Sequence, residues 1–110
     1  MERFVKGDVI VTPFPFSDLT SSMKRPALIV ATLPDDDLVV CQITTKRRDD
    51  PFQIELTDKD FTTGKLKINS FIRTSKLLSI RKSIVLYKIG SVKSNIINDA
   101  VNKIIGIFRK

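Results

Sequence analysis

The chain has 110 residues, of which 42% are hydrophobic, and its 19 Lys and Arg against 12 Asp and Glu give a formal net charge of +7. This length fits a single domain, residues 1–110, whose core needs no disulfide or metal to hold it. The sequence has no His and one Cys, which excludes histidine-dependent catalysis and a disulfide framework. The positive charge indicates a polyanionic partner such as a nucleic acid.

The chain carries no sign of export or of membrane insertion. Its single cysteine, Cys41, is typical of a protein from a reducing compartment. No apolar stretch has the length of a signal peptide or of a membrane span. We therefore expect a cytoplasmic protein with no membrane partner.

The first half of the sequence predicts short strands separated by turns. The β-branched run Val9–Thr12 is typical of a buried strand. Pro13 and Pro15 should end that strand, because proline donates no ladder hydrogen bond, and residues 14–24 are then expected to form a loop. The next predicted strands are Ala27–Thr32 and Leu38–Thr45, with a turn at Pro34–Asp37.

The second half predicts more short strands and then a helix. The strands expected here are Phe52–Leu56, Leu66–Thr74, Leu77–Ile80 and Val85–Ile89. Gly90 interrupts the strand pattern, and Ser94 can cap a helix. Apolar residues from Ile96 to Phe108 then recur on one helical face, which predicts an amphipathic helix covering a face of the sheet.

Many short strands followed by one helix indicate a mainly β fold. The connections are irregular, which favours a small, strongly bent antiparallel barrel with a C-terminal amphipathic helix. An open α+β sheet is the alternative.

The basic residues beside two strands form a candidate phosphate site. Pro26 restricts Arg25 to extended backbone, and a guanidinium can bind phosphate through two hydrogen bonds. Gln42 and Thr44 share the polar face of their strand, whereas Cys41 lies on the apolar face and is expected to be a buried hydrophobe. The cations Lys46–Arg48 follow and would attract a phosphodiester backbone.

Arg73 ends a later strand, and Ser75 and Lys76 follow it. Phe14 and Phe16 each follow a proline in the expected loop, which makes them the better candidates for stacking on bases.

Several segments, in this order, resemble the PemK/MazF family of toxins from type II toxin–antitoxin pairs. The matching segments are Gly7–Val11, Lys24–Val30, Gln42–Thr45, Asn69–Leu77 and Ile80–Ser83, followed by the amphipathic helix. The resemblance implies an SH3-like barrel of the CcdB/PemK type that is usually homodimeric. It also implies an endoribonuclease that cuts single-stranded RNA at short sequences without metal or cofactor, and a cognate antitoxin that covers the RNA groove.

The resemblance also assigns roles to individual residues. Arg25 and Thr44 fall on the catalytic pair of the family, and Arg73 falls on a further catalytic arginine. Ser75 stands where the family has a catalytic aspartate, and a serine hydroxyl is a poor general base. The reaction implied is attack of the ribose 2′-OH on phosphorus, so that DNA should be bound but not cut. The expected RNA contacts are Phe14, Lys24, Gln42, Thr45, Lys46, Arg47 and Ser70.

Three other functions remain open at this point. A gyrase-poisoning toxin of the same fold would need no arginine–threonine pair. A non-catalytic RNA-binding barrel is compatible with Ser75. A housekeeping barrel could use its basic surface to bind a protein partner.

Overall fold

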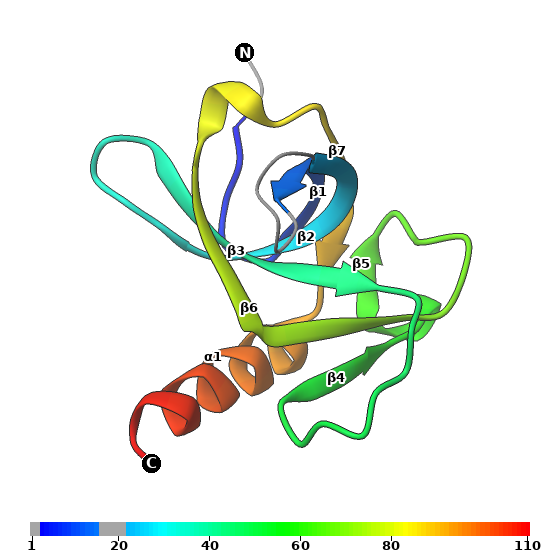
Figure 1. Cartoon of the computed structure of the whole chain (residues 1–110). Coiled ribbons are helices and arrows are strands. Elements are labelled where there is room, and N and C mark those ends of the chain that lie inside the picture. The colour runs from blue at the N-terminus through cyan, green and yellow to red at the C-terminus, as the bar shows by residue number, and fades with distance from the viewer. Residues whose placement is uncertain (1–2, 16–21) are drawn as a thin grey trace.

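The chain folds into one curled antiparallel sheet packed against a C-terminal helix (Figure 1). The computed structural model describes residues 3–15 and 22–110. Its strands are β1 Asp8–Pro15, β2 Ser22–Thr32, β3 Asp37–Thr44, β4 Gln53–Leu56, β5 Phe61–Thr63, β6 Ser70–Arg81 and β7 Tyr87–Val92; 3₁₀ turns lie at Asp58–Asp60 and Lys82–Ile84, and helix α1 spans Ser94–Phe108. The strand order is β4-β6-β3-β2-β1-β7-β5. The predicted mainly β, bent-barrel class is confirmed.

Strand β6 bends sharply and shapes the barrel. The sequence predicted two strands here, but β6 is continuous from Ser70 to Arg81, so that prediction is wrong. Cys41 of β3 pairs with Leu77, whereas the adjacent Gln42 pairs with Arg73, which leaves residues 74–76 of β6 without a counterpart. Such a bulge bends its strand and increases the local twist, which lets one strand serve both halves of the sheet.

Strand β1 continues through two prolines, contrary to the prediction that it ends at Thr12. Pro13 pairs with Lys24 and Pro15 with Ser22 on β2, while the pairing with β7 ends at Val11. Beyond Val11 the strand therefore has a partner on one side only, and proline is tolerated where an edge is open. Residues 16–21 of the predicted loop lie outside the described residues.

The two faces of the sheet bury two separate cores. One core contains Cys41 and Ile72 together with Ile96 and Ala100 of helix α1. The other is built around Ile10, Ile29 and Val40. Alternation of side chains along β1, β2 and β3 supplies both cores from the same strands. The sheet is thus buried on both faces over most of its area.

Helix α1 covers the sheet, as predicted, but its apolar face extends beyond it. Ile96 and Ala100 are buried, whereas Ile105 is 41% exposed and Phe108 is 75% exposed. The apolar spacing continues to Phe108, and the C-terminal turns of the helix extend past β6 (Figure 1). No helix within residues 3–15 and 22–110 has the length and apolar character needed to cross a membrane.

Gly90 lies within β7 rather than ending the strand pattern. A Cβ atom at Gly90 would lie 2.1 Å from the carbonyl oxygen of Thr63 on the adjacent strand β5. Real side chains do not tolerate that separation, so glycine is required there by the close approach of the two backbones. The prediction that Gly90 breaks the strand was therefore wrong, because the glycine serves packing and not a turn.

We expect the thiol of Cys41 to be inert in the folded protein. The side chain is fully buried in the first core, and burial raises its pKa from 9.0 to about 12. Because the thiolate is the nucleophile, iodoacetamide should label unfolded protein readily and folded protein much more slowly. The raised pKa of Cys41 also makes the stability of the fold depend on pH, because the folded protein holds the thiol proton more tightly than the unfolded chain does. The stability that comes from the buried neutral thiol is complete below pH 9.0 and is lost as the pH rises towards about 12.

Mass spectrometry of samples labelled with and without denaturant measures this difference, and Cys41→Ala provides the unlabelled control. Equal labelling rates in the two conditions would contradict the burial of Cys41.

Candidate nucleic-acid interface and catalytic site

A row of paired residues crosses four strands and forms the floor of the candidate site. Ala27 of β2 pairs with Gln42 of β3, Gln42 pairs with Arg73 of β6, and Arg73 pairs with Gln53 of β4. Directly paired residues project from the same face of a sheet. Gln42, Arg73 and Gln53 are therefore on one face, although they are far apart in the sequence.

Arg25 and Thr44 lie next to this row, where β2 and β3 separate. The pairing between β2 and β3 ends at Ala27 and Gln42, although β2 continues to Ser22 and β3 to Thr44. Each residue lies two positions beyond the last pair, so both share the face of the row. The structure thus brings together Arg25, Thr44 and Arg73, the three residues that the sequence suggested for catalysis, and their catalytic roles stay a prediction.

The Thr44 hydroxyl is oriented by the loop that follows it. The residue is 9% exposed, and its Oγ1 accepts a hydrogen bond of 3.2 Å from the backbone N–H of Lys46. A hydroxyl that accepts through a lone pair still has its own proton to donate. Thr44 can therefore offer a hydrogen bond to an anion beside the row.

Arg73 is a partly desolvated cation. Burial lowers its pKa from the ordinary value, the charge of Arg48 lowers it further, and Asp50 acts in the opposite direction. A guanidinium nevertheless stays charged at any working pH. Its Nε is buried and has no hydrogen-bond partner among residues 3–15 and 22–110. An approaching phosphate would supply an acceptor and an opposite charge, which would offset the lost hydration of Arg73 and its repulsion with Arg48.

Three exposed cations, Lys46, Arg47 and Arg48, extend the positive charge along the loop after β3. The Arg47 guanidinium carbon lies 5.2 Å from the centroid of the Phe71 ring, and its Nη2 lies 3.9 Å from a carboxylate oxygen of Glu55. Because that ion pair is exposed, it is worth little energetically and can be exchanged for a phosphate contact.

The remaining predicted residues are divided between the surface and the core. Lys24, Thr45 and Ser75 are exposed, and Ser75 lies in the bulge of β6. Phe14 is 6% exposed and packs in the second core, which contradicts its predicted stacking on bases. Ser70 is 3% exposed and its hydroxyl donates to the carbonyl of Ile68, which contradicts a direct RNA contact.

The two corrections have separate local causes. Continuation of β1 through its prolines places the Phe14 ring on the face of the second core, and Ser70 begins β6 beneath the preceding loop. Phe16, the other stacking candidate, lies outside the described residues. Sequence reasoning overlooked Gln53, whose only signal was its place on the polar face of the strand after the basic loop.

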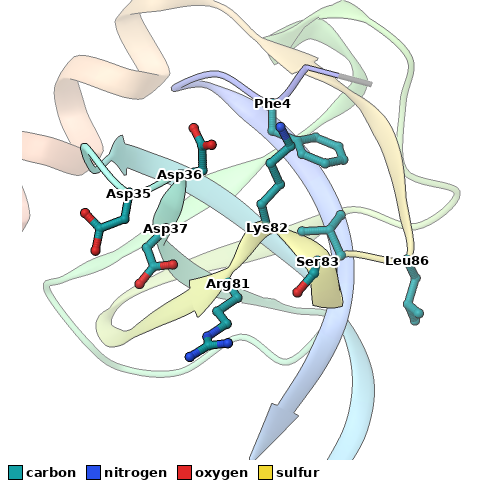
Figure 2. A pocket seen from close by; sticks show the side chains of 9 residues that line it. Phe4, Asp35, Asp36, Asp37, Arg81, Lys82, Ser83 and Leu86 are labelled. Carbon is teal, nitrogen blue, oxygen red and sulfur yellow. The ribbon is translucent and has the colours of Figure 1, made fainter. Parts of the chain in front are cut away.

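A cavity of about 740 Å³ is lined by none of the residues of this site. Figure 2 shows the side chains that line it. It lies between the turn Asp35–Asp37 and the connection from β6 to β7, with Arg81 and Lys82 in its wall. Asp37 begins β3 and Thr44 ends it, so the cavity and the candidate site are at opposite ends of one strand. The cavity wall carries three carboxylates, which repel phosphate, whereas the candidate site at the other end of β3 carries cations.

Within the described part of the chain, no group of three or more His, Cys, Asp or Glu side chains is arranged to hold a metal ion. The polar groups gathered at the candidate site are guanidinium, hydroxyl and amide groups, which bind anions.

The fold is shared with solved toxin structures. MazF from Deinococcus radiodurans (form I) is similar at a TM-score of 0.78 and 14% identity over 100% of both chains. An endoribonuclease from a mycobacterial species, in complex with its cognate antitoxin, has a TM-score of 0.71 and 20% identity, covering 94% of this chain and 96% of that one. Toxin MazF-mt6 of Mycobacterium tuberculosis has a TM-score of 0.67 and 16% identity, with coverages of 91% and 96%.

A comparison with curated protein sequences gave no significant match. The comparison with protein families, in contrast, matched residues 5–108 to the PemK-like, MazF-like toxins of type II toxin–antitoxin systems. Because this match spans nearly all of the 110 residues, the chain belongs to the PemK-like, MazF-like toxin family of type II toxin–antitoxin systems.

Proposed function

We propose that this protein is a toxin endoribonuclease that cleaves single-stranded RNA at specific sequences without a metal ion. The observation that carries the proposal is the gathering of Arg25, Thr44 and Arg73 on one face, where β2 and β3 separate and a run of exposed cations begins. Membership in the toxin family supports the same activity. Structures of the same fold are described as endoribonucleases.

The proposed reaction uses a nucleophile from the substrate. The ribose 2′-OH attacks the adjacent phosphorus, the bond to the 5′ oxygen breaks, and the products carry a 2′,3′-cyclic phosphate and a 5′-OH. The 2′-OH loses a proton and the leaving 5′ oxygen gains one. Negative charge grows on the non-bridging oxygens, where Arg25 and Arg73 stabilise it and Thr44 donates a hydrogen bond. One preorganised donor of this kind is worth about a hundredfold in rate.

Ser75 favours one alternative function, a non-catalytic RNA-binding barrel. Its hydroxyl replaces the carboxylate that the family resemblance leads us to expect and is a poor acceptor for the 2′-OH proton at neutral pH. A chain of this kind would keep the cationic surface, and so bind RNA with strong salt dependence, but would not cut it.

We also propose a cognate antitoxin as the physiological partner. Two solved complexes of the same fold, MazE–MazF of Deinococcus radiodurans, pair such a toxin with its antitoxin. By the same family analogy the chain acts as a homodimer in the cytoplasm, where a reduced buried Cys41 is the usual state.

A cleavage assay in EDTA tests the proposed activity. The wild-type chain is incubated with a long single-stranded RNA and with DNA of the same sequence, and the ends of the products are mapped. Discrete RNA cuts with 5′-OH ends and no DNA cuts are expected, because DNA lacks the 2′-OH.

Folded protein that binds the RNA without cutting it would replace the proposal with the non-catalytic barrel. Cleavage that requires an added divalent metal would contradict the proposed mechanism.

A further inference from the structure

The side chain of Gln53 holds the basic loop between β3 and β4 at two points. Its Oε1 accepts a hydrogen bond of 2.9 Å from the backbone N–H of Arg48, and its Nε2 donates one of 3.0 Å to the carbonyl of Lys46. The partners determine the orientation of the amide, because a backbone carbonyl only accepts and a backbone N–H only donates. One amide thus spans a turn that carries three consecutive cations.

Gln53 is itself firmly placed. It begins β4, is half-buried, and pairs with Arg73 of the row of paired residues. Its backbone N–H donates to the carbonyl of Asp50, and the Phe52 carbonyl before it accepts a hydrogen bond of 2.6 Å from the buried Thr74 hydroxyl. The anchor of the loop is therefore tied to the strand that carries Arg73.

The loop needs such an anchor for electrostatic reasons. Lys46, Arg47 and Arg48 are exposed and carry like charges, so their mutual repulsion favours a spread of loop conformations, which Asp49 and Asp50 at the end of the loop offset only in part. Contacts made by cations that are already positioned lose less conformational entropy on binding. A fixed loop would let several cations contact successive phosphates at once, whereas a loose loop would have to be ordered by the RNA.

We propose that Gln53 is a positioning residue that holds Lys46, Arg47 and Arg48 as a preformed phosphate track leading to Arg73 and Thr44. This inference rests on the proposed function, because it assigns the loop a role in binding the RNA backbone. It also connects the track to the row of paired residues, since Gln53 itself pairs with Arg73.

The test measures the binding of a fluorescent single-stranded DNA oligonucleotide, which offers phosphates but cannot be cleaved. Gln53→Met has a similar volume but removes both hydrogen bonds. We expect its affinity to fall about tenfold and its plot of log K against log salt to be shallower by about 0.7 to 1.4, which corresponds to one or two lost phosphate contacts. A defect that only lowers stability would leave the salt slope of the folded fraction unchanged.

Two further comparisons isolate the effect of the Gln53 side chain on binding of the oligonucleotide. Thr62→Val removes a side-chain-to-backbone hydrogen bond of 3.1 Å to Ser91 on a distant part of the sheet and should bind like wild type. Arg48→Ala should weaken binding less in the Gln53→Met background than in wild type, because residues that act together are not additive. If Gln53→Met fails to fold, Gln53→Asn, which is too short to span both partners, replaces it.

The outcomes separate this inference from the proposed function. Wild-type affinity and salt slope in the folded Gln53 variant, with RNA still cleaved by the wild-type chain, would overturn the role of Gln53 alone. If the wild-type chain bound the oligonucleotide without salt dependence and did not cleave RNA, both the role of Gln53 and the proposed function would be overturned.

Discussion

Replacing Arg25 with Ala is expected to lower the rate of RNA cleavage at saturating RNA by about two to three orders of magnitude. Arg25 lies on the face that carries Thr44 and Arg73, two residues beyond the last pair of β2 and β3. The loss should fall on kcat, because the charge that Arg25 stabilises develops in the transition state. Arg25→Lys should recover only part of it, since an ammonium lacks the bidentate geometry.

Arg81→Ala is the matched control for this substitution. Arg81 ends β6 opposite Asp37, at the far end of β3 from Thr44, and its removal changes the net charge by the same amount. Steady-state cleavage of one RNA over a range of RNA concentrations, by wild type and the three variants, measures kcat and KM. A rise in KM for Arg25→Ala with kcat unchanged would make Arg25 a binding residue only.

Replacing Asp8 with Ala is expected to destabilise the fold by about 1 to 3 kcal/mol, because it removes a buried carboxylate and leaves its partly buried partners unpaired. The carboxylate is 1% exposed. Its Oδ1 accepts a hydrogen bond of 2.6 Å from the Ser91 hydroxyl, and its Oδ2 accepts one of 2.9 Å from the Val5 N–H and lies 3.3 Å from the Lys88 ammonium. One side chain thus ties β1 to β7 and to the segment that precedes β1.

Urea unfolding of the variants measures this loss. Asp8→Asn keeps the shape of the side chain and one acceptor oxygen, so it should cost less than Asp8→Ala. Asp58→Ala removes an exposed carboxylate in the turn before β5 and should change the unfolding free energy by less than about 0.5 kcal/mol. If Asp8→Ala and Asp58→Ala had equal unfolding free energies, the contacts of the Asp8 carboxylate would make no net contribution to the stability of the fold.

Most elements of this fold can be derived from local patterns in the sequence. The β-branched run Val9–Thr12 and the alternating Gln53–Leu56 are strands, and the apolar spacing after Ser94 is a helix. These signals are local because side chains alternate along a strand and recur with helical period along a helix. The sequence also pointed to Arg25 and Thr44 as members of one site. That prediction came from the family resemblance and not from the periodicity of the side chains.

The errors arose where strand pairing overrides local preference. The prolines of β1 are tolerated because β7 has already separated from that strand, and no local signal announces an open edge. The same pairing buries Phe14 in the second core. The two short strands predicted on either side of residue 75 are one strand, because a bulge absorbs the bend.

The sequence by itself determined the charge, the strand and helix types and the residues that could bind phosphate. Tertiary structure alone decided which of them share a surface. Gln42, Arg73 and Gln53 form one row only through the register of three strands, and Gln53 reaches the loop only because β4 pairs with β6. Register depends on pairing between segments distant in the chain, and a shift of one residue would turn each side chain to the opposite face.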